Sequence, residues 1–247
     1  MNSAVSSNYR GDLAVADRIV ACDWKLVSQE LEARGYTLLK GLLSVDECVS
    51  LARLFSQDQF FRSRVVMKRH GFGSGEYKYF RYPLPKLIAE LRTAAYSHLV
   101  ETANRWNSIL GVDVQYPAKH KDFLERCHRA GQTKPTPLLL SYGPEDYNCL
   151  HQDLYGEHFF PLQLTILLSD EQRDFSGGEF VLVEQRPRMQ SKPIVVPLRQ
   201  GDAVVFAVQN RPVQGKRGPY RVILRHGVSR VRSGKRHALG VIFHDAQ

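Results

Sequence analysis

The sequence lacks an apolar run long enough to cross a bilayer, and its first residues contain no apolar core behind a basic cap. We therefore expect no membrane helix and no export signal, and we expect the protein to remain in the cytoplasm. Cysteine is also scarce: four residues are scattered along the chain without a CxxC pair, namely Cys22, Cys48, Cys127 and Cys149. This spacing argues against a disulfide framework and against a zinc knuckle.

Acidic residues are almost missing from one part of the chain. Between Arg186 and Arg236 a single acid, Asp202, accompanies thirteen Lys or Arg residues, and the whole chain has a formal net charge of +9. A second basic cluster surrounds Glu76 and consists of Arg62, Arg64, Lys68, Arg69, Lys78 and Arg81. Clustered positive charge is typical of proteins that bind nucleic acid. A solvated basic face is the alternative interpretation.

The first half of the chain has the patterns of helices. Apolar residues at helical spacing predict a helix over 23–34, ended by Gly35, with a strand over 36–43 after it. Ser44 and Glu47 form a capping box that begins a second helix, which ends near residue 55. Further amphipathic stretches predict helices over 87–110 and about 119–129.

The second half is rich in β-forming residues. After Pro137, seven or eight short apolar runs are separated by Gly, Pro or Asp, which favours a sandwich or barrel over alternating β/α units. A chain of 247 residues is long enough to bury one substantial core. We therefore expect one α+β domain over 1–247, with 1–137 as helical support and 138–247 as an all-β catalytic core.

The segment 60–83 mixes glycines with basic and aromatic residues. It is too polar and too interrupted for a pair of core strands, and it predicts an exposed hairpin or flap. Basic side chains beside aromatic rings can contact phosphates and stack on bases. The alternative is that the aromatic residues from Tyr77 to Tyr82 belong to an ordinary amphipathic strand over the core.

A candidate metal site opens the β-rich half. His151 and Asp153 are separated by one residue, so in an extended chain their side chains point to the same side. His226 closes a predicted strand further along and is a natural third ligand. Two imidazoles and one carboxylate form the facial arrangement that leaves positions open on Fe(II) for a chelating acid and O2. Arg236 follows on the next predicted strand and can bind a carboxylate through two hydrogen bonds.

The alternative interpretation is that these histidines are structural, because an HxD triplet alone is a weak signal. A cupin-like site that uses Glu157 and His158 is a further alternative, although the odd spacing of His158 from His151 places it on the opposite strand face. We expect His244 to be structural and His70 to belong to the flap.

From about 138 to 246 the chain resembles the 2-oxoglutarate/Fe(II) oxygenase superfamily, through the HQD at 151–153, the GGE at 177–179, the GD at 201–202 and the sequence HGVSRVRSGKR that contains His226 and Arg236. This resemblance implies a double-stranded β-helix, or jelly-roll, core with N-terminal helices packed against it. It also implies Fe(II) on His151, Asp153 and His226, with O2 as oxidant. Arg236 would bind the distal carboxylate of 2-oxoglutarate, and Tyr142 would add a hydroxyl.

Within that superfamily, the stretch from Leu140 through Tyr142 to the HQD resembles the AlkB-type nucleic-acid demethylases, although Leu140 replaces their Asn. The ten-residue step from His226 to Arg236 instead resembles the prolyl-hydroxylase-like members. The segments MKRHGFGSGEYKYFRYPLP and HQDLYGEHFFPLQ resemble a bacterial oxygenase family assigned to oxidative repair of nucleic acid. We therefore expect demethylation of alkylated bases in DNA or RNA, through hydroxylation of an N-alkyl carbon.

The residues that we expect to contact nucleic acid lie in the flap and in the loop 210–221: Lys68, Arg69, His70, Tyr77, Lys78, Tyr79, Arg81, Arg211, Lys216 and Arg217. A prolyl-hydroxylase-like protein or amino-acid hydroxylase is the rival enzymatic interpretation. A non-enzymatic β-sandwich that binds nucleic acid is the rival from another functional class.

Overall fold

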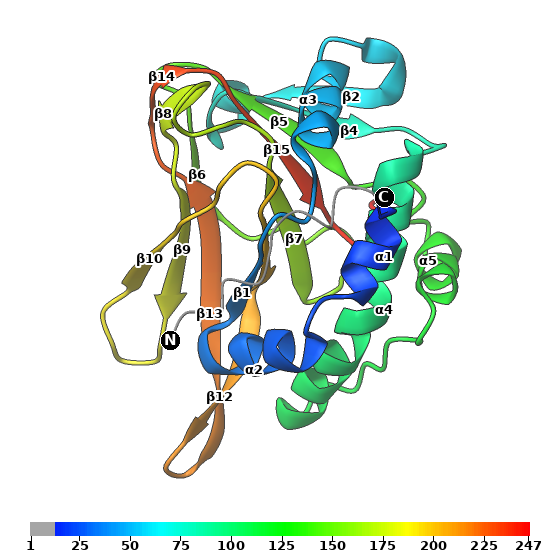
Figure 1. Cartoon of the computed structure of the whole chain (residues 1–247). Helices are drawn as coiled ribbons and strands as arrows, with labels where there is room; N and C mark the ends of the chain where they lie inside the picture. The colour runs from blue at the N-terminus through cyan, green and yellow to red at the C-terminus, as the bar shows by residue number, and fades with distance from the viewer. Residues whose placement is uncertain (1–12) are drawn as a thin grey trace, which may run out of the picture.

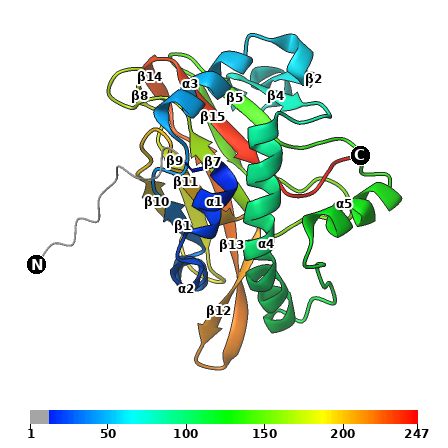
Figure 2. The same ribbon diagram turned by 45° about the vertical axis from the view of Figure 1, so that its right-hand side comes forward.

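Two antiparallel sheets lie against each other in the computed structural model, which describes residues 13–247, and helices cover the outer face of the larger sheet (Figures 1 and 2). The larger sheet has seven strands in the order β1 (Tyr36–Leu39), β11 (Ala203–Ala207), β7 (Leu162–Leu167), β15 (Arg236–Val241), β5 (Leu138–Tyr142), β4 (Glu76–Phe80) and β2 (Phe61–Val66). No helix in this described part of the chain is long and apolar enough to cross a membrane.

The smaller sheet forms the other wall of the interior. Its strands follow the order β10 (Lys192–Val196), β9 (Phe180–Gln185), β13 (Gly218–Val228), β6 (Tyr147–His151) and β3 (Gly73–Ser74), and β12 (Asn210–Gly215) pairs with β13. A separate two-stranded ribbon joins β14 (Val231–Gly234) to β8 (Phe175–Gly177). The β12–β13 hairpin extends well beyond the body of the sheet at the bottom of Figure 1.

Five α-helices are present in residues 13–247: α1 (Val15–Val20), α2 (Trp24–Arg34), α3 (Val45–Leu54), α4 (Lys86–Ile109) and α5 (His120–Arg129). Two short 3-10 turns cover Asp58–Phe60 and Met67–His70. The predicted capping box is confirmed, because the Ser44 hydroxyl accepts from the Glu47 amide and the Glu47 carboxylate accepts from the Ser44 amide. Gly35 ends α2 with φ +80°, a conformation that favours glycine.

Strand β7 separates two hydrophobic clusters. Its residues Leu162, Leu164 and Ile166 pack into the cluster under the helices, whereas Leu167 belongs to the cluster between the sheets. All six residues of β7 are buried, which requires cover on both faces. The helices therefore support the large sheet from outside and leave its inner face to line the space between the sheets.

A buried ion pair fixes α4 to the end of the chain. The Arg92 guanidinium lies 2.8 Å from the Asp245 carboxylate, and both side chains are almost fully buried. Arg92 also donates to the carbonyls of Ile242 and His244. This network satisfies a cluster of polar groups that would otherwise be costly to bury.

Two expectations about the chain's organisation need correction. The segment 60–83 is not a free flap, because β4 pairs with β5 inside the large sheet and β2 pairs with β4. The loop 210–221 is a β-hairpin, in which β12 pairs with β13 from Asn210 onward. Strands from the first half thus complete both sheets, so residue 137 does not separate helical support from the β core.

Candidate metal centre and its pocket

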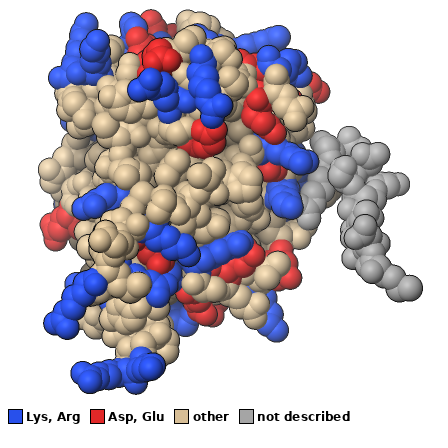
Figure 3. All heavy atoms as spheres, turned by 90° about the vertical axis from the view of Figure 1, so that its left-hand side faces the viewer, with Lys and Arg blue, Asp and Glu red and all other residues tan. Residues whose placement is uncertain are grey.

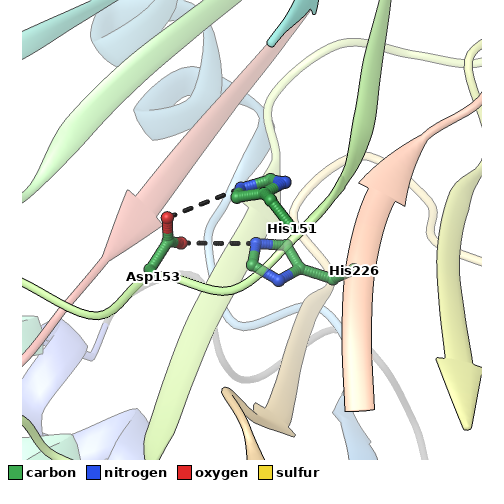
Figure 4. Close-up of side chains that lie close together, drawn as sticks. All are labelled: His151, Asp153 and His226. Atoms are coloured by element: carbon green, nitrogen blue, oxygen red, sulfur yellow. Dashed lines mark ion pairs between the residues drawn. The ribbon is translucent and has the colours of Figure 1, made fainter. Parts of the chain in front are cut away.

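The structure brings His151, Asp153 and His226 together between the sheets (Figure 4). Strand β6 ends at His151, Asp153 follows in the irregular segment beyond it, and His226 lies on β13 directly opposite His151. The Nε2 atoms of His151 and His226 lie 3.5 and 3.3 Å from the two carboxylate oxygens of Asp153. One ligand atom from each residue lies within 4.8 Å of the others, a spacing that a single metal ion can bridge.

Neighbouring groups orient these side chains. His151 Nδ1 lies 2.8 Å from the Cys149 carbonyl, which can only accept, so Nδ1 carries a proton and Nε2 is the nitrogen turned toward Asp153. The Tyr155 hydroxyl donates to Oδ1 of Asp153 at 2.7 Å. The ring of Phe206 lies 4.7 Å from the ring of His226 and packs against it. Such contacts fix the direction in which each ligand atom points.

The electrostatics of the cluster favour an anionic Asp153 and shift the pKa values of the two imidazoles in opposite directions. Burial raises the pKa of Asp153, but hydrogen bonds and charge from His151 and His226 outweigh it and hold this pKa well below its ordinary value. Burial and the charge of His151 lower the pKa of His226. Burial alone would lower the pKa of His151, yet Asp153 raises it overall. A divalent cation would take the place of the proton that Asp153 attracts to His151.

The cluster opens into a cavity of about 320 Å³ between the sheets. Its floor comes from the inner face of the large sheet, with Leu140 and Tyr142 on β5, Gln163 and Thr165 on β7, and Arg236, Ala238 and Gly240 on β15. The cavity therefore joins the His151–Asp153–His226 cluster to a buried guanidinium.

Arg236 has an unusual environment for a buried cation. Its side chain is almost fully buried, and neither Nε nor Nη1 has a hydrogen-bond partner. Burial lowers its pKa, although the Tyr142 and Glu179 side chains oppose that effect. An uncompensated buried charge is unfavourable by several kcal/mol, on the order of what a paired anion restores. A carboxylate ligand fits this position, and Tyr142 lies directly opposite Arg236 on β5.

The rim of the cavity holds Phe72, an aromatic residue of the 60–83 segment in which base stacking was expected, and Leu150, which the sequence did not single out. Phe72 and Leu150 line the cavity and remain 48% and 47% exposed. The Cys149 amide donates to the Phe72 carbonyl, which holds Phe72 beside β6, and the His70 ring stacks on the Phe72 ring. Phe72 thus lies where a stacking residue of the 60–83 segment was expected, at the edge of the cavity.

Several predicted nucleic-acid contacts are exposed, namely Lys68, Arg69, His70, Arg81, Lys216 and Arg217. Lys68, Arg69 and His70 directly precede the cavity-lining Gly71 and Phe72. Lys216 and Arg217 lie at the tip of the β12–β13 hairpin, roughly 25 Å of strand from His226 at about 3.3 Å per residue. The basic residues at 68–70 therefore lie next to the cavity, whereas those at the hairpin tip lie far from it.

Three predicted contacts are corrected by burial. Lys78 is 7% exposed and bonds to the Asp58 carboxylate and the Phe55 carbonyl, because β4 is an inner strand of the sheet. Tyr79 is 9% exposed on the same strand. Arg211 is 1% exposed and pairs with Glu184. These residues support the fold, as in the amphipathic-strand alternative, whereas Tyr77 of β4 does line the cavity.

The basic run near the C-terminus is more dispersed than its sequence suggests. Arg221 and Arg225 of β13 are exposed, whereas Val222, Leu224 and His226 between and after them are buried, so the arginines face away from the cavity. On the face shown in Figure 3, Lys and Arg side chains stand above and below a broad uncharged band, and several lie beside acidic ones. On this face, charge alone does not mark one continuous nucleic-acid path.

The other histidines do not form a second metal cluster. Among residues 13–247, His151, Asp153 and His226 are the one set of three His, Cys, Asp or Glu side chains close enough to share an ion. This finding gives no support to the cupin-like alternative with Glu157 and His158. His244 is buried, and its Nδ1 accepts a hydrogen bond from the Phe160 amide, as expected of a structural residue.

Comparison with known families decides the class of protein. The family Oxygenase-NA, described as "Oxygenase, catalysing oxidative methylation of damaged DNA", matches residues 75–246. The chain belongs to this oxygenase family. An uncharacterized protein of Mycobacterium tuberculosis is 50% identical over 167 residues, which cover 68% of this chain and 72% of that protein. Membership of an oxygenase family contradicts the non-enzymatic alternative.

Solved structures establish the fold. A prolyl-4-hydroxylase of Pseudomonas putida superimposes with a TM-score of 0.53 at 14% identity, over 91% of this chain and 99% of that one. A 2-oxoglutarate/Fe(II) oxygenase-family oxidoreductase of Burkholderia pseudomallei gives 0.52 at 15% identity, over 92% and 94%. The expected α+β fold with a double-stranded β-helix core is confirmed. The chain thus shares its fold with a member of the 2-oxoglutarate/Fe(II) oxygenase family.

Proposed function

We propose that this protein is an Fe(II)- and 2-oxoglutarate-dependent oxygenase that removes alkyl groups from damaged bases in nucleic acid. The observation that carries the proposal is the presence, in one cavity, of the His151–Asp153–His226 cluster and the buried guanidinium of Arg236, whose Nε and Nη1 have no hydrogen-bond partner. Membership of a family described by the oxidation of damaged DNA supports the choice of substrate.

Different residues of the cavity would bind the metal and the co-substrate. His151 and His226 would bind Fe(II) through Nε2, and Asp153 would bind it through its carboxylate. When bound, Fe(II) together with O2 and 2-oxoglutarate, which becomes succinate and CO2, supplies the hydroxylation of a C–H bond. Arg236 would hold the distal carboxylate of 2-oxoglutarate, and the buried Tyr142 beside it would exclude water from that end.

After hydroxylation, the reaction requires little further chemistry from the residues of the protein. Hydroxylation of an N-alkyl carbon gives a hemiaminal, which breaks down to an aldehyde and the unmodified base without a protein nucleophile. The chain must hold the base with its alkyl carbon near the metal and keep bulk water away. The apolar part of the floor, formed by Leu140 and Ala238, suits that task.

The residues at the rim of the cavity favour an extruded base as the substrate. A base must leave its stack before a buried metal centre can reach it, and aromatic faces stabilise the extruded state. Phe72 is exposed at the cavity mouth and stacks on His70, and the exposed Lys68 and Arg69 precede it. This arrangement places stacking surface and phosphate-binding charge at the entrance.

Succinate formation tests the proposal. We expect N-methylated single-stranded DNA or RNA to accelerate succinate release and to lose its methyl group, whereas the same unmethylated oligonucleotide should do neither. The ten-residue spacing between His226 and Arg236 favours the rival protein hydroxylase, so a proline-containing peptide belongs in the same assay. Stimulation by the peptide alone would reject the nucleic-acid substrate and leave the oxygenase assignment intact.

A further inference from the structure

A second cavity lies at the C-terminal end of α4, which is the lower end of that helix in Figure 2. Its volume is about 130 Å³, and it shares no lining residue with the cavity that contains the His151–Asp153–His226 cluster. Neither the proposed metal ligands nor the proposed 2-oxoglutarate anchor uses it. A cavity of this size can hold a molecule on the order of the size of benzene.

The walls of this cavity are partly aromatic. Trp106 of α4 and Phe123 of α5 line it, and both belong to the buried hydrophobic cluster under the helices. Val114 lines it as well and is 40% exposed, so the cavity reaches the protein surface. Trp106 also has a buried indole N–H without a hydrogen-bond partner. The cavity can therefore accept an apolar group from solvent.

Two arginines bring positive charge to the same cavity. Arg126 of α5 donates to the Gln115 carbonyl at 2.8 Å, and Arg221 of β13 donates to the Leu110 carbonyl at 3.4 Å. In the part of the chain that the structure describes, neither guanidinium forms an ion pair, and each keeps further N–H donors. Glu157 is the one acid among the described lining residues, and it is exposed. The cavity thus offers cationic donors to an anion.

The cavity also contacts the connection that carries Asp153. Strand β6 ends at residue 151 and β7 begins at residue 162, and residues 157–159 and 161 of the irregular connection between them line the cavity. The Tyr116 hydroxyl donates to the Phe159 carbonyl at 2.8 Å. Near the other end of this connection, the Tyr155 hydroxyl donates to Asp153. A ligand in the second cavity therefore touches the same short segment as the proposed metal ligand.

We propose that this second cavity binds a small carboxylate with an apolar body, and that its occupant holds the connection 152–161 in place. The aromatic walls select the apolar body, and Arg126 and Arg221 select the negative charge. The small volume excludes a nucleotide or a peptide. This inference goes beyond the proposed function and does not depend on it.

Benzoate is a suitable probe, because it joins a carboxylate to a ring of the size that the cavity holds. The chain has two tryptophans, so its proton–nitrogen correlation spectrum contains two indole signals. The full chain is measured with Zn(II) in place of paramagnetic Fe(II) and with saturating 2-oxoglutarate, which occupies the main cavity. We expect benzoate to shift the Trp106 signal saturably. The Trp24 signal should not move, because its N–H donates to the Ile19 carbonyl elsewhere, and Trp24→Phe assigns the two signals.

The two arginines are tested together. We expect Arg126→Gln/Arg221→Gln to weaken benzoate binding about 10-fold, because it removes charge-assisted hydrogen bonds. Arg129→Gln/Arg225→Gln removes one arginine from each of the same two elements, outside the cavity, and should keep the native Kd. Benzamide lacks the charge and inorganic phosphate lacks the ring, so each should bind at least about 10-fold more weakly than benzoate.

Hydrogen exchange tests the effect on the connection 152–161. At a benzoate concentration ten times its Kd, openings of this segment that release benzoate should become about 10-fold rarer, and its amides should exchange more slowly by that factor. Unchanged exchange at saturation overturns the effect on the connection.

Three results overturn the site itself. These are a Trp106 signal that does not respond to benzoate, a native Kd in Arg126→Gln/Arg221→Gln, and binding of benzamide or phosphate as tight as that of benzoate. None of these measurements uses demethylation, so a failure of the proposed function leaves this inference standing, and the reverse also holds.

Discussion

Arg236 and Tyr142 occupy directly opposed positions on β15 and β5, with the guanidinium carbon 5.5 Å from the centre of the tyrosine ring. Both side chains are fully buried. Burial raises the pKa of Tyr142 far above its ordinary value, more than Arg236 and Asn148 lower it, so its hydroxyl stays protonated. The pair thus offers a cation and an aromatic wall at the inner end of the cavity.

Replacing Arg236 should mainly affect the use of 2-oxoglutarate. We expect Arg236→Ala to raise the KM for 2-oxoglutarate about 30-fold or more, because losing one member of a buried charge pair costs at least ~2 kcal/mol. Arg236→Lys should recover only part of this loss, because its ammonium keeps the positive charge but cannot form the bidentate pair. Arg225→Ala, an exposed arginine on β13, is the control. An unchanged KM in Arg236→Ala would place the anchor elsewhere.

Removing the carboxylate of Asp153 should abolish metal binding. We expect Asp153→Ala to retain no stoichiometric Fe(II) in anaerobic equilibrium dialysis, because two imidazoles alone form an incomplete facial site. Glu157 lies outside the cluster, so the Glu157→Ala variant should bind one Fe(II) per chain as the native protein does. Native affinity in Asp153→Ala, or loss of iron in Glu157→Ala, would contradict the proposed ligand set.

The two exposed basic pairs should differ in their contribution to oligonucleotide binding. We expect the double variant Lys68→Ala/Arg69→Ala to weaken binding of methylated single-stranded DNA and to reduce the dependence of log Kd on log salt by about one to two ion equivalents. Lys216→Ala/Arg217→Ala removes the same charge from the distant hairpin tip and should have a smaller effect. Fluorescence anisotropy across a salt series measures both. Equal losses would show that the hairpin also contacts the strand.

Stability should fall in mild acid because of a buried histidine. Burial and the charge of Arg92 lower the pKa of His120 to about 3, although its hydrogen bond to the Phe243 carbonyl opposes this. Between pH 6.5 and 3 the unfolded chain therefore binds a proton that the folded chain does not, and folding loses up to ~1.4 kcal/mol per pH unit. Chemical denaturation of His120→Gln across this range should show a shallower slope. A slope equal to that of the native protein would contradict the assignment.

The order of chemistry-bearing residues along the sequence allowed the convergence of His151, Asp153 and His226 to be predicted. His151, Asp153, His226 and Arg236 were selected from their spacing and from the apolar strands around them, and all four line one cavity. The capping box at Ser44 could also be predicted from the sequence, because it depends on contacts between residues three positions apart. Local patterns of this kind can be recognised in the sequence without knowledge of the tertiary structure.

Residues whose role depends on sheet neighbours were not predictable in the same way. The alternating polar and aromatic residues of β4 fit an exposed hairpin as well as an inner strand, and only the pairing with β5 shows that Lys78 is buried. Gln163 was missed although a signal existed. Polar Gln163 and Thr165 alternate with leucines in a strand buried on both faces, which indicates a polar cavity on one side.

Strand β1 has a consequence for the rest of the family. The family match begins at residue 75, next to β4, so β1 lies outside it, yet β1 pairs with β11 and covers an edge of the large sheet. An uncovered edge invites pairing with another chain. Relatives that differ before this point must therefore protect the equivalent of β11 by some other segment, or associate through it.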